Sequence, residues 1–146
     1  MPFGMDHPIT DVCMLCRNLE RSIAFYRDQL GFRLRRKDPG FAEFHAAGTT
    51  LALWEIAHVA EHVGFADVPT DVPVHKVMTA VRVADRATVD AVVAELSAKG
   101  VTFLRPAALL PRNAYCAYFA DPDGNVWEIY AWDAGGPFKG ERPPVG

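Results

Sequence analysis

The 146-residue chain has few cysteines and no pattern that would make them a disulfide framework. Cys13-x-x-Cys16 lies in an apolar stretch expected to be a strand, where residues three apart point to opposite faces. A zinc site would also need a second ligand pair, and only Cys116 remains. We therefore expect free thiols, with Cys13 of most interest because it shares a strand face with Asp11.

The sequence also lacks a positive excess and any long apolar run. Its formal net charge is −3, which gives no basic footprint for nucleic acid. No stretch of about 18 apolar residues occurs, so we expect no membrane span. The first residues lack the cationic-then-apolar pattern of a secretory signal. These absences predict a cytoplasmic protein whose partners are neither nucleic acid nor membranes.

What the sequence does contain is a repeat. Leu53-Trp54-Glu55-Ile56 ends the first half and Val126-Trp127-Glu128-Ile129 ends the second. Each is preceded by an apolar strand, a helix that ends at glycine and further strands. The pattern predicts two β-α-β-β-β modules in one domain, with Glu55 and Glu128 at equivalent positions. The tryptophans, which alternate with the glutamates, should pack under the helices.

The expected boundaries follow from turn residues and apolar periodicity. One domain, residues 1–146, should hold module one at 9–57, a connection at 58–76, module two at 77–132 and a flexible tail at 133–146. Expected strands are 11–15, 32–36, 41–45, 50–56, 77–83, 101–105, 115–120 and 125–132. Expected helices run from about 18 to 30 and from 86 to 99, with Gly31 and Gly100 as stops.

Two segments resemble the signatures of vicinal oxygen chelate proteins. The first comprises Asn18-Leu19-Glu20-Arg21-Ser22, Phe25-Tyr26 and Leu30-Gly31-Phe32, and the second is Tyr118-Phe119-Ala120-Asp121-Pro122-Asp123-Gly124-Asn125-Val126-Trp127-Glu128. That superfamily includes glyoxalase I, extradiol dioxygenases, fosfomycin-modifying enzymes and bleomycin-resistance proteins. The resemblance implies an α+β fold in which the paired modules form a curved mixed sheet, a half-barrel often completed in a homodimer.

The resemblance also implies up to four metal ligands, on the first and last strands of each module. These positions fall at Asp11, Glu55, Met78 and Glu128, and histidine is common in the family at the first and third. A thioether is a poor ligand for magnesium, manganese, nickel or ferrous iron. We therefore expect no tightly bound cofactor. The alternative is a divalent metal held by Asp11, Glu55 and Glu128, with Glu128 as the catalytic residue.

Strand alternation extends these positions to a predicted ligand-binding set: Asp11, Cys13, Leu53, Glu55, Met78, Cys116, Tyr118, Glu128, Tyr130 and Trp132. Acids among apolar and aromatic side chains suit a small organic ligand that is cationic or aromatic. The sequence thus predicts a protein that sequesters an antibiotic or metabolite, similar to the bleomycin-resistance proteins. A metal-dependent lyase, isomerase or dioxygenase is the alternative, and solvated glutamates left over from duplication are a third reading.

Overall fold

The computed structural model describes residues 9–46, 48–63, 77–110, 113–134 and 136. The chain divides into two compact units, Met1–Pro73 and Val74–Gly146, and each is described by itself. Among the described residues, no helix combines the length and the apolar character needed to cross a membrane.

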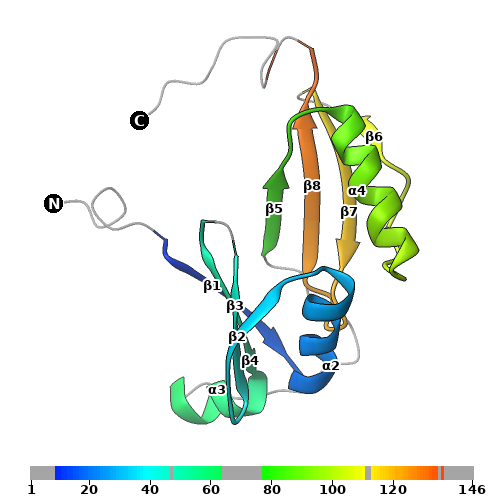
Figure 1. Cartoon of the computed structure of the whole chain (residues 1–146). Helices are drawn as coiled ribbons and strands as arrows, with labels where there is room; N and C mark the ends of the chain where they lie inside the picture. Colours follow the sequence, from blue (N-terminus) through cyan, green and yellow to red (C-terminus); the bar gives the residue numbers. More distant parts are fainter. Residues whose placement is uncertain (1–8, 47, 64–76, 111–112, 135, 137–146) are drawn as a thin grey trace, which may run out of the picture. The chain divides into compact units, whose positions relative to one another are not determined.

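The first unit is a four-stranded mixed sheet with helices (Figure 1). Its strand order is β1-β4-β3-β2, with β1 and β4 parallel and the other neighbours antiparallel. The elements are β1 (Asp11–Cys16), α2 (Leu19–Ala24), the π-helical turn η1 (Phe25–Gln29), β2 (Arg33–Asp38), β3 (Phe41–His45), β4 (Thr50–Glu55) and α3 (Ile56–Val63).

The helical segment formed by α2 and η1 begins and ends as the sequence predicts, although its second half is π-helical. The Asn18 side chain accepts a hydrogen bond from the backbone N–H of Arg21 at 3.0 Å, which satisfies one N–H of the first turn. Gly31 follows the helical segment at φ +82°, a conformation that glycine adopts without a Cβ penalty. The helical segment buries Tyr26, whose ring lies 6.0 Å from that of Phe44 on β3. One face of the sheet is therefore covered by this segment.

The second unit repeats the same topology. Its elements are β5 (Met78–Arg82), α4 (Arg86–Ala98), β6 (Ala108–Leu110), β7 (Ala114–Ala120) and β8 (Val126–Trp132). The strand order is β5-β8-β7-β6, again with one parallel pair at the edge. The predicted α+β class, with a β-α-β-β-β order in each half, is confirmed.

Helix α4 covers one face of the second sheet. Asp85 caps it by accepting from the backbone N–H of Thr88 at 2.8 Å. The helix packs on β7 and β8 and buries Val89 among the residues of that face (Figure 1). Trp127 is 4% exposed and stacks on Phe119 with ring centroids 6.1 Å apart. Trp127 is therefore a core residue, as the alternation predicts.

Two elements differ from the prediction. Helix α3 occupies residues that the sequence reading assigns to the end of a strand and to a connection. Its buried Val59 and Ala60 follow Ile56 at helical spacing, a signal that could have revealed it. The strand predicted at 101–105 is reduced to a single bridge between Phe103 and Phe119, and β6 forms further along the chain.

The residues after β8 begin in a fixed arrangement rather than as a tail. Asn113, at φ +66°, donates from its side-chain amide to the carbonyls of Asp133, Ala134 and Gly136 at 3.3, 3.1 and 2.9 Å. The remainder of the predicted tail, 137–146, lies outside the described residues, as does 64–76 of the predicted connection.

Candidate functional site

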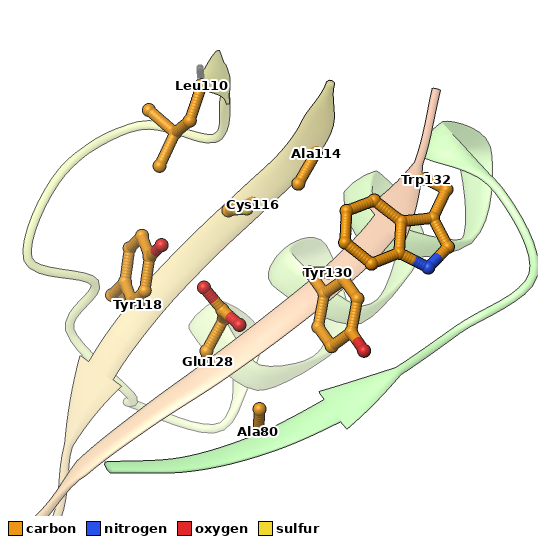
Figure 2. A pocket seen from close by; sticks show the side chains of 8 residues that line it. All are labelled: Ala80, Leu110, Ala114, Cys116, Tyr118, Glu128, Tyr130 and Trp132. Carbon is orange, nitrogen blue, oxygen red and sulfur yellow. The ribbon is translucent and has the colours of Figure 1, made fainter. Parts of the chain in front are cut away.

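A hollow of about 380 Å³ opens on the face of the second sheet opposite helix α4 (Figure 2). It is lined by side chains from all four strands of the unit: Ala80, Leu110, Ala114, Cys116, Tyr118, Glu128, Tyr130 and Trp132. Figure 2 shows them on one side of the strands, with the helix on the far side. The hollow therefore belongs wholly to the second unit.

Strand alternation creates this lining. On β8 the buried Trp127, Ile129 and Ala131 alternate with the half-buried Glu128, Tyr130 and Trp132. In the antiparallel pair with β7, Tyr118 lies opposite Glu128 and Cys116 lies opposite Tyr130. The structure thus brings together five residues of the predicted binding set, all from β7 and β8.

The carboxylate of Glu128 lies beside a phenol and a thiol. Desolvation, and then hydrogen bonding to Glu128 and Cys116, raise the pKa of the Tyr118 phenol. Burial first, with Glu128 adding to it and Tyr118 opposing it, raises the pKa of the Cys116 thiol. Cys116 is 3% exposed. At neutral pH the phenol and the thiol are therefore both protonated.

Aromatic rings form the rest of the hollow. The rings of Tyr130 and Trp132 lie 5.3 Å apart at an interplanar angle of 77°, which makes an edge-to-face corner. The methyl groups of Ala80 and Ala114 leave space beside this corner (Figure 2). The predicted set lacked both alanines and Leu110. Alternation from Cys116 could have found Ala114, whereas Leu110 required knowledge of where β6 lies.

Met78 shares a strand and a face with Ala80 but does not line the hollow. Its side chain is 48% exposed at the edge strand β5. The register places it opposite Val126, two residues before Glu128 on β8.

In the first unit, Asp11 and Cys13 lie on the same face of β1, and Met14 and Cys16 are buried on the other. Cys13 is an exposed free cysteine. Desolvation of its sulfur against the sheet, and then the negative charge of Asp11, raise the pKa of the thiol to about 11. Cys13 is therefore a protonated thiol at neutral pH.

The predicted placement of Leu53 on an open binding face is wrong, and Glu55 lines a separate hollow of the first unit, of about 460 Å³, with Leu19, Lys37 and Gly40 among its neighbours. In the ladder between β3 and β4, Leu53 pairs with Ala42, and both are 0% exposed. Glu55 lies on the same face of β4 as Leu53, two residues further on, and accepts a hydrogen bond at 2.9 Å from the backbone N–H of Leu19, the first residue of α2. Leu53 is therefore a core residue, and Glu55 helps to hold the start of a helix.

The same register separates Asp11 from Glu55. Asp11 pairs with Thr50, whereas Glu55 pairs with Cys16 at the other end of the ladder. The two carboxylates thus lie on opposite faces of the sheet and five residues apart along it, a separation of roughly 16 Å at 3.3 Å per residue. A single metal ion could not bind both, so the predicted ligand set Asp11, Glu55 and Glu128 cannot act as a unit.

The doubled Trp-Glu-Ile endings are not structurally equivalent. The parallel ladders begin at Asp11 with Thr50 in the first unit and at Met78 with Val126 in the second. When the ladders are matched at these pairs, Ala52 rather than Glu55 corresponds to Glu128. The predicted equivalence of the two glutamates is therefore wrong.

Trp54 likewise departs from its predicted place under a helix. It pairs with Phe41 on the face opposite α2, with ring centroids 6.1 Å apart at 89°. Its indole N–H donates to Nδ1 of His58 on α3 at 2.7 Å. Gly40, at φ +73°, lies against the His58 ring, where an added Cβ would come within 2.9 Å. Trp54 therefore joins the sheet to α3 instead of filling the core beneath α2.

The donor chemistry does not fit a family-type metal centre within either unit. Among the residues that the structure describes, no three His, Cys, Asp or Glu side chains lie close enough to hold a metal ion. On the face with Glu128, the neighbouring donors are a phenol and a protonated thiol, and β5 offers only the exposed thioether of Met78. Such a set is a weak one for a divalent ion that prefers oxygen or imidazole ligands.

Comparison with solved structures gives close matches over most of the chain. A crystal structure of a glyoxalase/bleomycin resistance protein/dioxygenase from Nocardioides is 36% identical, with a TM-score of 0.86, and the match covers 94% of this chain and 90% of that one. A glyoxalase-related enzyme from Fulvimarina pelagi is 28% identical, with a TM-score of 0.72 and coverage of 85% and 87%. A lactoylglutathione lyase from Agrobacterium tumefaciens, 24% identical with a TM-score of 0.68 and coverage of 85% and 92%, shares the fold.

A family model also matches residues 5–129, which span both units. Its description is the glyoxalase/bleomycin resistance protein/dioxygenase superfamily. The family match and the shared topology agree with the resemblance carried by the two sequence signatures. The chain therefore belongs to the glyoxalase/bleomycin resistance protein/dioxygenase superfamily.

Proposed function

We propose that this protein binds and sequesters a small organic molecule, an antibiotic or a metabolite, in the hollow of its second unit. The observation that carries the proposal is one carboxylate, Glu128, set among three aromatic side chains on an otherwise apolar face. Ligand pockets are typically apolar and aromatic with a few polar groups that fix orientation. This composition suits an amphipathic molecule with an aromatic part and a polar or cationic part.

The residues at the family's metal-ligand positions support ligand binding rather than metal-dependent catalysis. Asp11 and Met78 stand where the family resemblance implies imidazole ligands, and Asp11 cannot share an ion with Glu55. We expect fewer than about one tightly bound transition-metal ion per two chains, because the remaining donors do not confer affinity for such ions. Elemental analysis of protein purified without chelators or metal-affinity resin checks this expectation. Stoichiometric nickel, iron or zinc that is lost in Glu128→Gln would contradict it.

The second candidate is a metal-dependent lyase, isomerase or dioxygenase. The observation in its favour is that Glu128, the position that the resemblance assigns to a metal ligand, faces the hollow. The 28% identical relative from Fulvimarina pelagi is described as a glyoxalase-related enzyme. In this alternative Glu128 would hold the ion. The metal analysis above separates the two functions.

Binding is tested by isothermal titration with metal-free bleomycin and with N-methylquinolinium, a flat aromatic cation. We expect binding of at least one probe, weakened about tenfold in Glu128→Gln, or about 1.4 kcal/mol. Tyr118→Phe should weaken it less, because the ring remains. Glu95→Gln, on the exposed side of α4, is the matched control and should have no effect. Affinity that is indifferent to Glu128 would place the site elsewhere.

Two copies of the chain are expected to associate. The resemblance implies a homodimer, and light scattering coupled to size-exclusion chromatography measures the mass directly. A species of one-chain mass at micromolar concentration would contradict the expectation.

A further inference from the structure

We infer that the hollow around Glu128 selects an onium cation, an alkylated ammonium or similar group without N–H donors, attached to or next to an aromatic ring. The inference rests on the proposed small-molecule binding and deepens it by naming the ligand class. It follows from three features of the lining: how few acceptors it offers, how the single carboxylate is occupied, and how the rings are placed.

The first feature is the scarcity of acceptors. Among the eight lining residues, Glu128 has the only anionic group, and the phenol oxygens of Tyr118 and Tyr130 are the other side-chain oxygens. A primary ammonium carries three N–H donors, and each donor buried without a partner costs free energy. The backbone of β7 and β8 is engaged in the sheet ladder and offers little in addition. The lining is therefore better matched to a cation that has no N–H groups.

The second feature is the occupation of the carboxylate. Tyr118 stands directly opposite Glu128 in the antiparallel ladder, and Cys116 lines the hollow on the same face of β7. Both groups have raised pKa values and are protonated, so each is a donor beside the carboxylate. These donors can use part of the accepting capacity of the Glu128 carboxylate. What Glu128 still presents to the hollow is chiefly negative charge. The ligand group that matches it is a cation without directional N–H donors.

The third feature is the aromatic corner. Tyr130 and Trp132 meet edge to face at 5.3 Å, and Tyr118 stands across from them (Figure 2). Rings that surround a cation attract it through their negative faces, and tryptophan does so most strongly. The side chains of Ala80 and Ala114 leave room for alkyl groups. The arrangement provides the two components of onium recognition, aromatic faces and a nearby counter-charge.

The test compares three probes on the wild-type protein by titration calorimetry. Phenyltrimethylammonium is the onium, tert-butylbenzene is its uncharged isostere, and benzylammonium supplies the same charge with three N–H donors. We expect the onium to bind about tenfold more tightly than either of the others, in line with cation–π recognition. Glu128→Gln should reduce the preference over the isostere, and Trp132→Leu should weaken binding of the onium the most.

A second readout locates the site and guards against misfolded variants. Chemical shifts of the methyl groups of Ala80 and Ala114 should move on adding the onium to wild-type protein. Tyr115→Phe, on the same strand as Tyr118 but hydrogen-bonded to Asp90, is the matched control and should bind normally.

Equal or tighter binding of benzylammonium or tert-butylbenzene would overturn the onium inference while leaving the proposed binding function intact. If no probe bound but metal-free bleomycin did so through Glu128, the onium inference would also fail on its own. Failure of every probe, bleomycin included, would remove both.

Discussion

The two units carry the same Trp-Glu-Ile ending on the same kind of strand, yet they turn it to opposite faces. On β4, Glu55 points to the side of α2 and Trp54 away from it. On β8, Trp127 packs toward α4 and Glu128 points into the hollow. A one-residue shift of register exchanges every side chain between faces. Similar local sequence therefore does not imply similar position.

The difference follows from what each strand must bury. On β4, Leu51 and Leu53 lie on the helix-covered face, which brings Glu55 to that face at the strand end. There it meets the free backbone N–H of Leu19, a group that needs an acceptor. On β8 the buried residues include Ile129 and Ala131, so Glu128 alternates outward. Packing of the neighbours therefore decides which face of its sheet each glutamate occupies.

The largest expected effect contrasts the two tryptophans. Trp127→Ala should lower the free energy of unfolding by about 3–5 kcal/mol, because it empties a core position beneath α4. Trp54→Ala should lower it by about 1–2 kcal/mol, through loss of one hydrogen bond and an edge contact. Urea denaturation followed by circular dichroism measures both. Equal losses would argue that both tryptophans occupy core positions after all.

The next effect contrasts the glutamates in stability. Glu55→Ala should cost about 1–3 kcal/mol, because the backbone N–H of Leu19 loses its acceptor. Glu128→Gln should remain within about 0.5 kcal/mol of wild type, since its carboxylate faces the hollow. Hydrogen exchange at Leu19 should accelerate only in Glu55→Ala. Protection of Leu19 in that variant would contradict the assigned hydrogen bond.

A smaller effect concerns the thiol beside Asp11. Because the pKa of its thiol is raised to about 11, Cys13 should react slowly with iodoacetamide at pH 8. The rate should increase as the pH is raised through about 11, where the thiolate forms. Asp11→Asn removes a negative charge that opposes the thiolate, so the midpoint should move to lower pH. Peptide mass spectrometry separates Cys13 from Cys16 and Cys116. A midpoint unchanged in Asp11→Asn would mean that desolvation alone sets the pKa.

Much of the fold could be predicted, because its signals are local. Asn18 and Gly31 mark the ends of the first helical segment, and apolar alternation marks β7 and β8. The residues that β7 and β8 contribute to the candidate site could be predicted for the same reason. The face of Glu55 could not, because it depends on which residues of β3 pair with β4, a non-local choice. Helix α3 was missed because its short apolar spacing follows a strand without a break.

The most direct test of the different roles of the two glutamates is a parallel titration of Glu128→Gln and Glu55→Gln with the same aromatic cation, N-methylquinolinium, at a temperature where both variants are folded. Binding should be about tenfold weaker in Glu128→Gln, or about 1.4 kcal/mol, and within about twofold of wild type in Glu55→Gln. Equal weakening in the two variants would show that both glutamates face one ligand, and would contradict the assignment of Glu55 to the helix-covered face.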